Sequence, residues 1–292
     1  MISNQLRNFA TRVGVLGAGQ MGTGIGIVSS RTAQYDVVYI DPNAAQLKKS
    51  EDFVKNWCAK ELKKEKMTAA DQQNMLNKIQ WSSEIQSLEK CDLIVEAVNE
   101  NFDLKKKIFS EVAKVAPDNC ILASNTSSIS ISKIAGVIPD RAHQVIGMHF
   151  MNPVPVMQLV EVIRALQTDD NTHAQTLKYA EAMGKTCSTA RDTPGFIANR
   201  ILMPYINEAV FALYEGIGTV EDIDKTMKLG TNVPMGPLTL ADFIGLDTCL
   251  AIMKVLNSEL ADSKYRPCPL LVNYVDAGRL GRKSGQGFYK YK

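Results

Sequence analysis

Short apolar runs alternate with helix-like segments through the first two thirds of the chain. The apolar runs are residues 12–16, 37–40, 93–98, 120–123 and 145–148. Between them lie longer segments with apolar residues at helical spacing, notably 43–66 and 104–115. Runs of this length are typical of buried strands. Their alternation with helices predicts an α/β fold with a mostly parallel, doubly wound sheet and helices on both of its faces.

The pattern changes near residue 190, where Pro194 and Gly195 interrupt the chain and strand signals nearly vanish. The remainder predicts helices over 196–214, 221–229, 239–260 and 269–277. We therefore expect two domains, a Rossmann-like domain of residues 1–190 and an all-helical domain of residues 191–292. Apolar residues spread around the 196–214 helix rather than forming one narrow stripe, which predicts a homodimer through the helical domain.

Composition narrows the class of protein. The 33 Lys and Arg residues nearly balance the 31 Asp and Glu residues, and a net charge of +2 predicts no nucleic-acid partner. The six cysteines form no CxxC pair and no cluster with histidine, so we expect a reducing compartment and no metal site. No apolar stretch approaches the roughly 20 residues that span a bilayer, which predicts a soluble protein without a membrane partner.

Residues 1–12 contain Arg7 and Arg12 and no acidic residue. This composition is typical of the remnant of a mitochondrial presequence, and a short leader of another kind has the same composition. The mitochondrial matrix is the expected location, and the cytoplasm is the alternative.

A dinucleotide-binding motif follows the first apolar run. Residues 17–22 read GAGQMG and open a helix, and we expect the cofactor to contact Gly17, Gly19, Gln20, Met21 and Gly22. Glycines at these positions permit a tight turn and close approach of the backbone to a pyrophosphate. Asp41 ends the second predicted strand, where a carboxylate binds ribose hydroxyls and repels a 2′-phosphate. The cofactor is therefore predicted to be NAD, with NADP left open because Arg31 is available to offset the charge.

The chain has three histidines, and only one occupies a position typical of a catalytic residue. His173 lies in a polar segment and His143 precedes a strand, so both are expected to contact solvent. His149 ends the apolar run 145–148, and the carboxyl ends of strands are where open α/β sheets build their sites. A buried structural histidine remains an alternative.

Glu161 is the expected partner of this histidine. It lies within QLVEVI, and burying a carboxylate without a partner costs several kcal/mol. A histidine that transfers a proton needs an anion to fix its tautomer and stabilise its charged form. The alternative is a glutamate facing solvent on an edge strand.

Two more polar segments are candidates for the same site. Asn152 begins the turn NPVP, and SNTSS at 124–128 follows another strand. These hydroxyl groups either reach the site or cap the next helix, which is the commoner use of Ser and Thr.

Taken together, these residues resemble the short-chain L-3-hydroxyacyl-CoA dehydrogenase family over essentially the whole chain. The matching stretches are GAGQMG at 17–22, VEAVNEN at 95–101, SNTSS at 124–128, HFMNPVPVMQLVEVI at 149–163, DTPGFIANR at 192–200, PMGPLTLADFIGLD at 234–247 and GRKSGQGFYKY at 281–291. The segment from His149 to Glu161 is the most specific of them.

The resemblance implies NAD-dependent oxidation of L-3-hydroxyacyl-CoA to 3-ketoacyl-CoA in fatty-acid β-oxidation, by a homodimer. It implies that His149 is the base and Glu161 its partner, and that Ser127, Asn152 and Asn199 contact the reacting end of the acyl-CoA. It further places Glu100, Lys105 and Lys283 near the cofactor, and Lys64, together with Ser127, at the CoA substrate. Trp57 stands where the family often has a serine, so this part of the CoA site departs from the pattern.

Two other functions are compatible with the motifs. One is a dehydrogenase of a free hydroxy acid on the same fold, and the other is a non-catalytic NAD-binding protein. Seven lysines between residues 48 and 66 favour a CoA ester with its phosphates, although a solvated helix face also explains them. The joint presence of His149, Glu161, Ser127 and Asn152 favours an enzyme.

Overall fold

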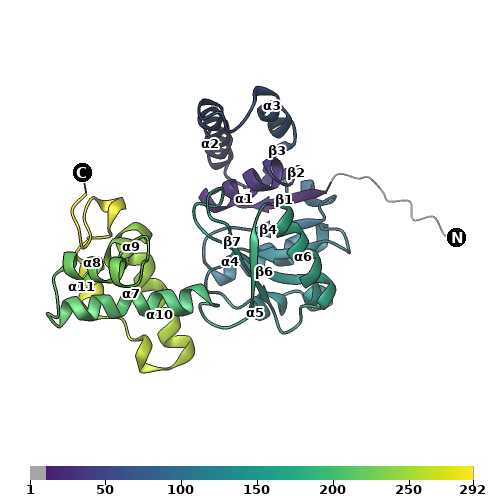
Figure 1. Ribbon diagram of the computed structural model, residues 1–292. Coiled ribbons are helices and arrows are strands. Elements are labelled where there is room, and N and C mark those ends of the chain that lie inside the picture. The colour runs from purple at the N-terminus through teal and green to yellow at the C-terminus, as the bar shows by residue number, and fades with distance from the viewer. Residues whose placement is uncertain (1–10, 292) are drawn as a thin grey trace. The chain divides into compact units, whose positions relative to one another are not determined.

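The computed structural model describes residues 11–291, which form two compact units joined after Asp192 (Figure 1). The first ten residues of the predicted leader, 1–12, lie outside this range. No helix in the described range is long and apolar enough to cross a membrane.

An eight-stranded sheet forms the centre of the first unit. Its strands are β1 (Arg12–Leu16), β2 (Asp36–Ile40), β3 (Ile79–Ser82), β4 (Leu93–Glu96), β5 (Ile121–Ser124), β6 (Val145–Phe150), β7 (Leu159–Arg164) and β8 (Thr186–Arg191). They lie in the order β3-β2-β1-β4-β5-β6-β7-β8. Each neighbouring pair is parallel except β6 and β7, which are antiparallel. The predicted doubly wound, mostly parallel sheet is confirmed.

Helices connect these strands. They are α1 (Gln20–Arg31), α2 (Ala44–Lys63), α3 (Ala69–Asn77), α4 (Phe102–Val115), α5 (Ile131–Ala135) and α6 (Asp170–Ala182). The strand order reverses between β1 and β4, so right-handed connections place α1 and α4 on opposite faces of the sheet. In Figure 1, α2 and α3 lie side by side above α1, and Cys58 of α2 is 3.8 Å from the sulfur of Met75 in α3.

A glycine brings α1 close to β2. A Cβ atom at Gly26 would lie 2.1 Å from the hydroxyl oxygen of Tyr39, a fully buried residue of β2. The Tyr39 hydroxyl donates a hydrogen bond of 2.8 Å to the carbonyl of Thr23 in the same helix. Because a buried hydroxyl needs a partner, this bond fixes how the helix that follows the glycine-rich turn lies against the sheet.

The second unit consists of helices α7 (Ala198–Tyr214), α8 (Val220–Gly230), α9 (Pro237–Ile244), α10 (Leu246–Leu260) and α11 (Pro269–Asp276) around their own apolar core. The buried carboxylate of Asp242 in α9 holds the C-terminal segment, residues 281–291, in place. It accepts hydrogen bonds of 2.9 Å from the N–H groups of Phe288 and Tyr289 and from the hydroxyl of Tyr291.

Two expectations about individual elements are wrong. The single helix predicted over 239–260 is two helices, because Gly245 has φ of +102° and cannot continue a right-handed helix. The strand predicted over 145–148 continues to Phe150, so His149 lies within β6 rather than after it.

Candidate active site

The glycine-rich turn joins β1 to α1. Gly17 has φ of +94°, and a Cβ atom at Gly22 would lie 1.9 Å from the carbonyl oxygen of Gly17, so the turn requires glycine at both positions. Nothing lies within 4 Å of the position that a Cβ at Gly19 would occupy. Gln20 and Met21 begin α1, whose first N–H groups and dipole favour an anion at this open position.

Asp41 lies directly after β2, beside this turn. Its carboxylate accepts hydrogen bonds from the N–H groups of Ala18 (3.0 Å) and Asn43 (2.9 Å). Gly17, Gly19 and Asp41 also line a cavity of about 590 Å³ whose walls include the apolar side chains of Ile40, Ile85, Val98, Leu104 and Ile108. An apolar cavity with a carboxylate at its edge and a glycine turn beside it fits an adenosine with its pyrophosphate.

His149 and Glu161 are directly opposite each other in the antiparallel β6–β7 pair. The distance from Nδ1 of His149 to Oε2 of Glu161 is 2.8 Å, and Glu161 is completely buried. Burial rules out the alternative of a solvent-facing Glu161. A carboxylate can only accept, so Nδ1 of the imidazole carries the proton in this bond and Nε2 of the neutral ring is left with a lone pair.

Ser127 lies on the other side of this ring. Its Oγ atom is 3.1 Å from Nε2 of His149, and the two residues come from the loop after β5 and from β6. The helix-capping alternative does not apply to Ser127, because Ser130 is the N-cap of α5. The structure therefore joins Ser127, His149 and Glu161 in one hydrogen-bonded row.

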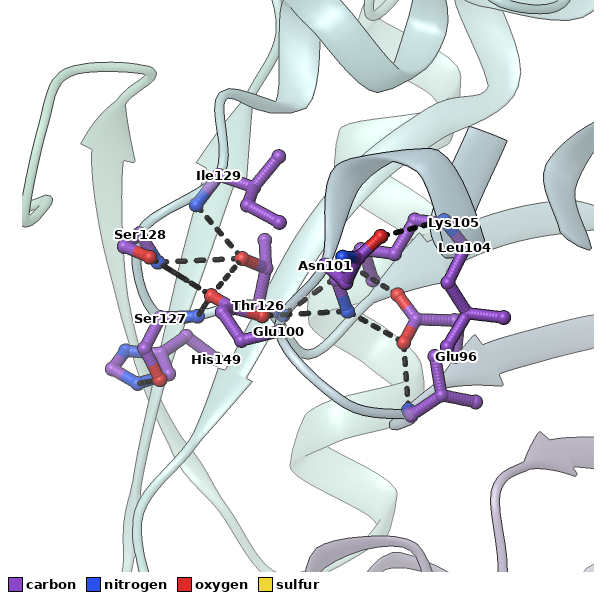
Figure 2. A network of polar contacts seen from close by, with 12 residues as sticks. Glu96, Glu100, Asn101, Leu104, Lys105, Thr126, Ser127, Ser128, Ile129 and His149 are labelled. Atoms are coloured by element: carbon purple, nitrogen blue, oxygen red, sulfur yellow. Dashed lines mark hydrogen bonds and ion pairs between the residues drawn. The ribbon is translucent and has the colours of Figure 1, made fainter. Parts of the chain in front are cut away.

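A second polar network supports the Ser127 loop (Figure 2). Lys105 of α4 is almost fully buried, and its ammonium lies 2.6 Å from the carboxylate of Glu96 and 3.4 Å from that of Glu100. Glu100 in turn accepts hydrogen bonds from the N–H groups of Ser127 (2.9 Å) and Ser128 (3.0 Å) and from the hydroxyl of Thr126. The buried lysine and the loop that carries Ser127 are thus linked through one carboxylate.

The surroundings of Glu100 keep it ionised. Burial acts to raise the pKa of Glu100, but the Lys105 ammonium and the hydrogen bonds from residues 126–128 together lower it below its usual value. An ionised Glu100 can accept all of these hydrogen bonds at neutral pH.

Sequence reasoning missed two residues of this network. Glu96 ends β4 and is completely buried, where it also accepts a hydrogen bond of 2.6 Å from Ser124. Asn125 accepts one of 2.9 Å from the N–H of Phe150, next to His149. Glu96 had the same signal as Glu161, a carboxylate with apolar residues on both sides, whereas Asn125 had none beyond its place in SNTSS.

The other residues that the sequence predicted for the site lie in different parts of the structure. The side-chain oxygen of Asn152 accepts a hydrogen bond of 3.0 Å from the amide of Gln20, which links the turn after β6 to the start of α1. Lys64 is exposed at the end of α2 and pairs with Glu61 at 3.0 Å. Asn199 and Lys283 belong to the second unit, where Asn199 is buried in the first turn of α7 and Lys283 pairs with Asp247 at 2.5 Å.

The other two histidines do not share the setting of His149. His143 is exposed in the turn before β6, as expected. His173 is half-buried and its Nε2 lies 3.1 Å from the hydroxyl of Thr189, and burial lowers its pKa. His173 thus keeps contact with solvent, as expected, while its place in α6 brings it toward β8.

Comparison with known proteins covers nearly the whole chain. The family model for the NAD-binding domain of 3-hydroxyacyl-CoA dehydrogenase matches residues 12–193, and the model for the C-terminal domain of the same enzyme matches residues 195–291. The first of these supports NAD as the cofactor, as predicted.

Individual relatives agree with the family models. The chain is 50% identical to a 3-hydroxybutyryl-CoA dehydrogenase of Bradyrhizobium diazoefficiens over 281 residues, which are 96% of this chain and 95% of the relative. It is also 50% identical to a probable 3-hydroxybutyryl-CoA dehydrogenase of Bacillus subtilis, over 95% of this chain and 96% of that one. The crystal structure of (S)-3-hydroxybutyryl-CoA dehydrogenase from Ralstonia eutropha is similar with a TM-score of 0.94 and 48% identity, over 97% of this chain and 100% of that one.

The position of Asp41 leads to a prediction about cofactor choice. We expect NAD to be preferred over NADP by at least about tenfold in kcat/KM, equivalent to about 1.4 kcal/mol, because the carboxylate repels a 2′-phosphate. Asp41→Ala should reduce this preference, which steady-state kinetics with both cofactors will measure. Equal use of the two cofactors by the unmodified protein would contradict the assignment.

Proposed function

The chain belongs to the 3-hydroxyacyl-CoA dehydrogenase family and is an NAD-dependent oxidoreductase, and we propose that it oxidises short-chain L-3-hydroxyacyl-CoA with His149 as general base and Glu161 as its orienting partner. The observation that carries this proposal is the row of Ser127, His149 and Glu161. The names of the similar proteins favour a four-carbon acyl chain. Fatty-acid β-oxidation is the proposed metabolic setting.

The chemistry requires a base at this position. An alcohol releases a hydride from its carbon readily only if the hydroxyl proton leaves as well. When bound, NAD accepts that hydride. Nε2 of the neutral His149 has the lone pair that takes the hydroxyl proton, and the imidazolium that results is stabilised by Glu161 across the strand pair. The reverse reaction uses the protonated ring to donate the proton to the ketone oxygen.

Four further residues are proposed to hold the substrate. Ser127 is already within hydrogen-bond distance of Nε2, where the substrate hydroxyl must also lie, and so is suited to bind that hydroxyl. Asn152 and Asn199 are proposed to contact the reacting end of the substrate as well, as the resemblance implies. Lys64 is proposed to meet the CoA moiety, and its exposed side chain leaves the ammonium accessible to a phosphate.

The lysines of α2 support a CoA substrate less strongly than their number suggests. Lys48 pairs with Asp52 at 2.7 Å and Lys55 pairs with Glu51 at 2.5 Å, both as neighbours one turn apart on an exposed face. Such pairs are typical of a solvated helix, so the preference for a CoA ester over a free acid depends on the relatives.

The cytoplasm is the location that we propose, rather than the mitochondrial matrix. Half of the residues are identical in the bacterial relatives from Bradyrhizobium and Bacillus, over nearly the full length of each. All six cysteines are free thiols, in keeping with a reducing compartment.

The substrate class is tested by comparing two ketones. We expect NADH-dependent reduction of acetoacetyl-CoA and a much lower kcat/KM, by about tenfold or more, for free acetoacetate, because the free acid lacks the contacts that CoA provides. Absorbance of NADH at 340 nm measures both. Equal turnover of the two substrates would favour a hydroxy-acid dehydrogenase, and no turnover of either would favour a non-catalytic NAD-binding protein.

The role of Glu161 is tested by Glu161→Gln. This change keeps the shape of the side chain and removes a charge-assisted hydrogen bond worth about 1.5–3 kcal/mol, so we expect a loss of roughly 10- to 150-fold in rate. The protonated ring loses its anionic partner, so the rate of ketone reduction should begin to fall at a lower pH than in the unmodified enzyme. Rate–pH profiles in both directions measure this effect.

Glu89→Gln is the matched control, because the Glu89 side chain is 63% exposed and should leave both profiles unchanged. Near-normal rates and unmoved profiles for Glu161→Gln would show that Glu161 has no part in the proton transfer.

A homodimer through the second unit is also proposed. Large apolar side chains are exposed there, among them Ile201 (66%), Ile217 (75%) and Leu229 (75%). We expect a mass twice the 32.2 kDa of one chain by light scattering at micromolar concentration, and a shift towards the monomer for Ile201→Glu. A monomer in the unmodified protein would contradict the proposal.

A further inference from the structure

The turn of residues 152–157, between β6 and β7, begins three residues after His149. Inside the turn, the N–H groups of Val156 and Met157 both donate hydrogen bonds of 3.0 Å to the carbonyl of Pro153. The side chain of Val156 is 72% exposed, so this part of the turn gains little from apolar packing. Other contacts must determine where the turn lies.

Two such contacts come from distant parts of the chain. Val154 is buried against Gly24 of α1, where a Cβ atom would lie 2.8 Å from the Cβ of Val154. Lys185, the residue before β8, extends its ammonium to the turn and donates hydrogen bonds to the carbonyls of Val154 (2.5 Å) and Met157 (2.8 Å). One ammonium thus holds the backbone on both sides of Pro155 and Val156.

Lys185 is unusual because it is buried without a carboxylate. It is 8% exposed, and none of the ion pairs among residues 11–291 includes it. Burial lowers the pKa of its ammonium. A buried ammonium is costly unless its N–H groups are bonded, and hydrogen bonds from a charged donor are about twice as strong as neutral ones. The two carbonyls of the turn are therefore what offsets the burial of Lys185.

The turn leads back to the active site through Asn152. This residue opens the turn and accepts the hydrogen bond from Gln20 at the start of α1. Fixing the carbonyls of Val154 and Met157 limits where Asn152 can lie relative to His149, which lies three residues earlier, in β6. A displacement of about 1 Å in such a group is enough to lower a rate by about 100-fold.

We infer that Lys185 is a positioning residue, which holds the 152–157 turn so that Asn152 meets the reacting end of the substrate. This inference rests on the proposed role of Asn152. Lys185 itself takes no part in the proton transfer, because both of its hydrogen bonds go to backbone carbonyls of the turn.

A double-mutant cycle tests the inference in the full-length enzyme with acetoacetyl-CoA and NADH. Lys185→Met keeps the length of the side chain and removes the donor, and we expect kcat to fall at least tenfold while the KM for NADH changes less than threefold. In the Asn152→Ala background the same change should lower kcat by less than twofold, because the group that Lys185 positions is gone. Lys185→Arg keeps a charged donor and should recover most of the lost rate.

Lys90→Met is the control, since the Lys90 side chain is 77% exposed and its removal should not alter kcat. If Lys185→Met does not fold, Lys185→Gln replaces it in the same cycle, with a smaller loss and the same non-additivity. Equal losses in both backgrounds would overturn the inference and leave Lys185 a purely structural residue, with Asn152 still at the substrate. If Asn152→Ala alone left kcat unchanged, the role of Asn152 would fail, and the inference with it.

Discussion

A buried carboxylate on a strand is the constraint from which the arrangement of the site follows. Glu161 lies in the interior of the sheet, where an unpaired charge is strongly unfavourable, so it needs a donor within hydrogen-bond distance. A side chain directly opposite on a neighbouring strand is well placed to provide that donor. The reversed direction of β7 places His149 there, and the ring is thereby fixed both in orientation and in tautomer. The residue that we propose as the base is therefore held in place by the same hydrogen bond that satisfies Glu161.

The rest of the site is formed by the loops that follow the carboxyl ends of the parallel strands. The carboxyl ends of these strands lie on the same side of the sheet. The glycine turn follows β1, Asp41 follows β2, the Glu100 loop follows β4 and the Ser127 loop follows β5. Glu96 and Lys105 form a buried pair beneath two of these loops. Removing either partner would leave the other as an unpaired buried charge, so loop position and stability are linked in this region. The cavity beside Asp41 and the row of Ser127, His149 and Glu161 are consequently built on the same sheet.

The elements that could be predicted from the sequence are those in which burial or backbone geometry restricts the residue type. Central strands such as β1 and β6 are continuous apolar runs, and the glycines of the turn are required by its backbone, so both were found. β3 and β8 were missed because they are the two edge strands of the sheet. An edge strand is more exposed and permits polar residues such as those of β8, TCSTAR. The helix over 239–260 was misjudged because a single glycine does not reveal its φ angle in the sequence.

The same reasoning explains which site residues were found. Glu161 could be predicted because a lone carboxylate among apolar neighbours demands a partner. The partners of Lys185 are backbone carbonyls, which every residue has, so no pattern of side chains could indicate them. The link between Glu96 and Lys105 joins a strand to the following helix, and its geometry emerges only from the folded loop between them.

The C-terminal segment illustrates how a short stretch of chain can be integral to a folded unit. Its backbone supplies the donors for Asp242, a carboxylate buried in α9, so the segment and the helix depend on each other. A protease that cut between residues 281 and 287 would not simply trim the unit. It would separate a buried anion from its donors, so a single nick is expected to release the helical unit to further digestion instead of producing a stable fragment.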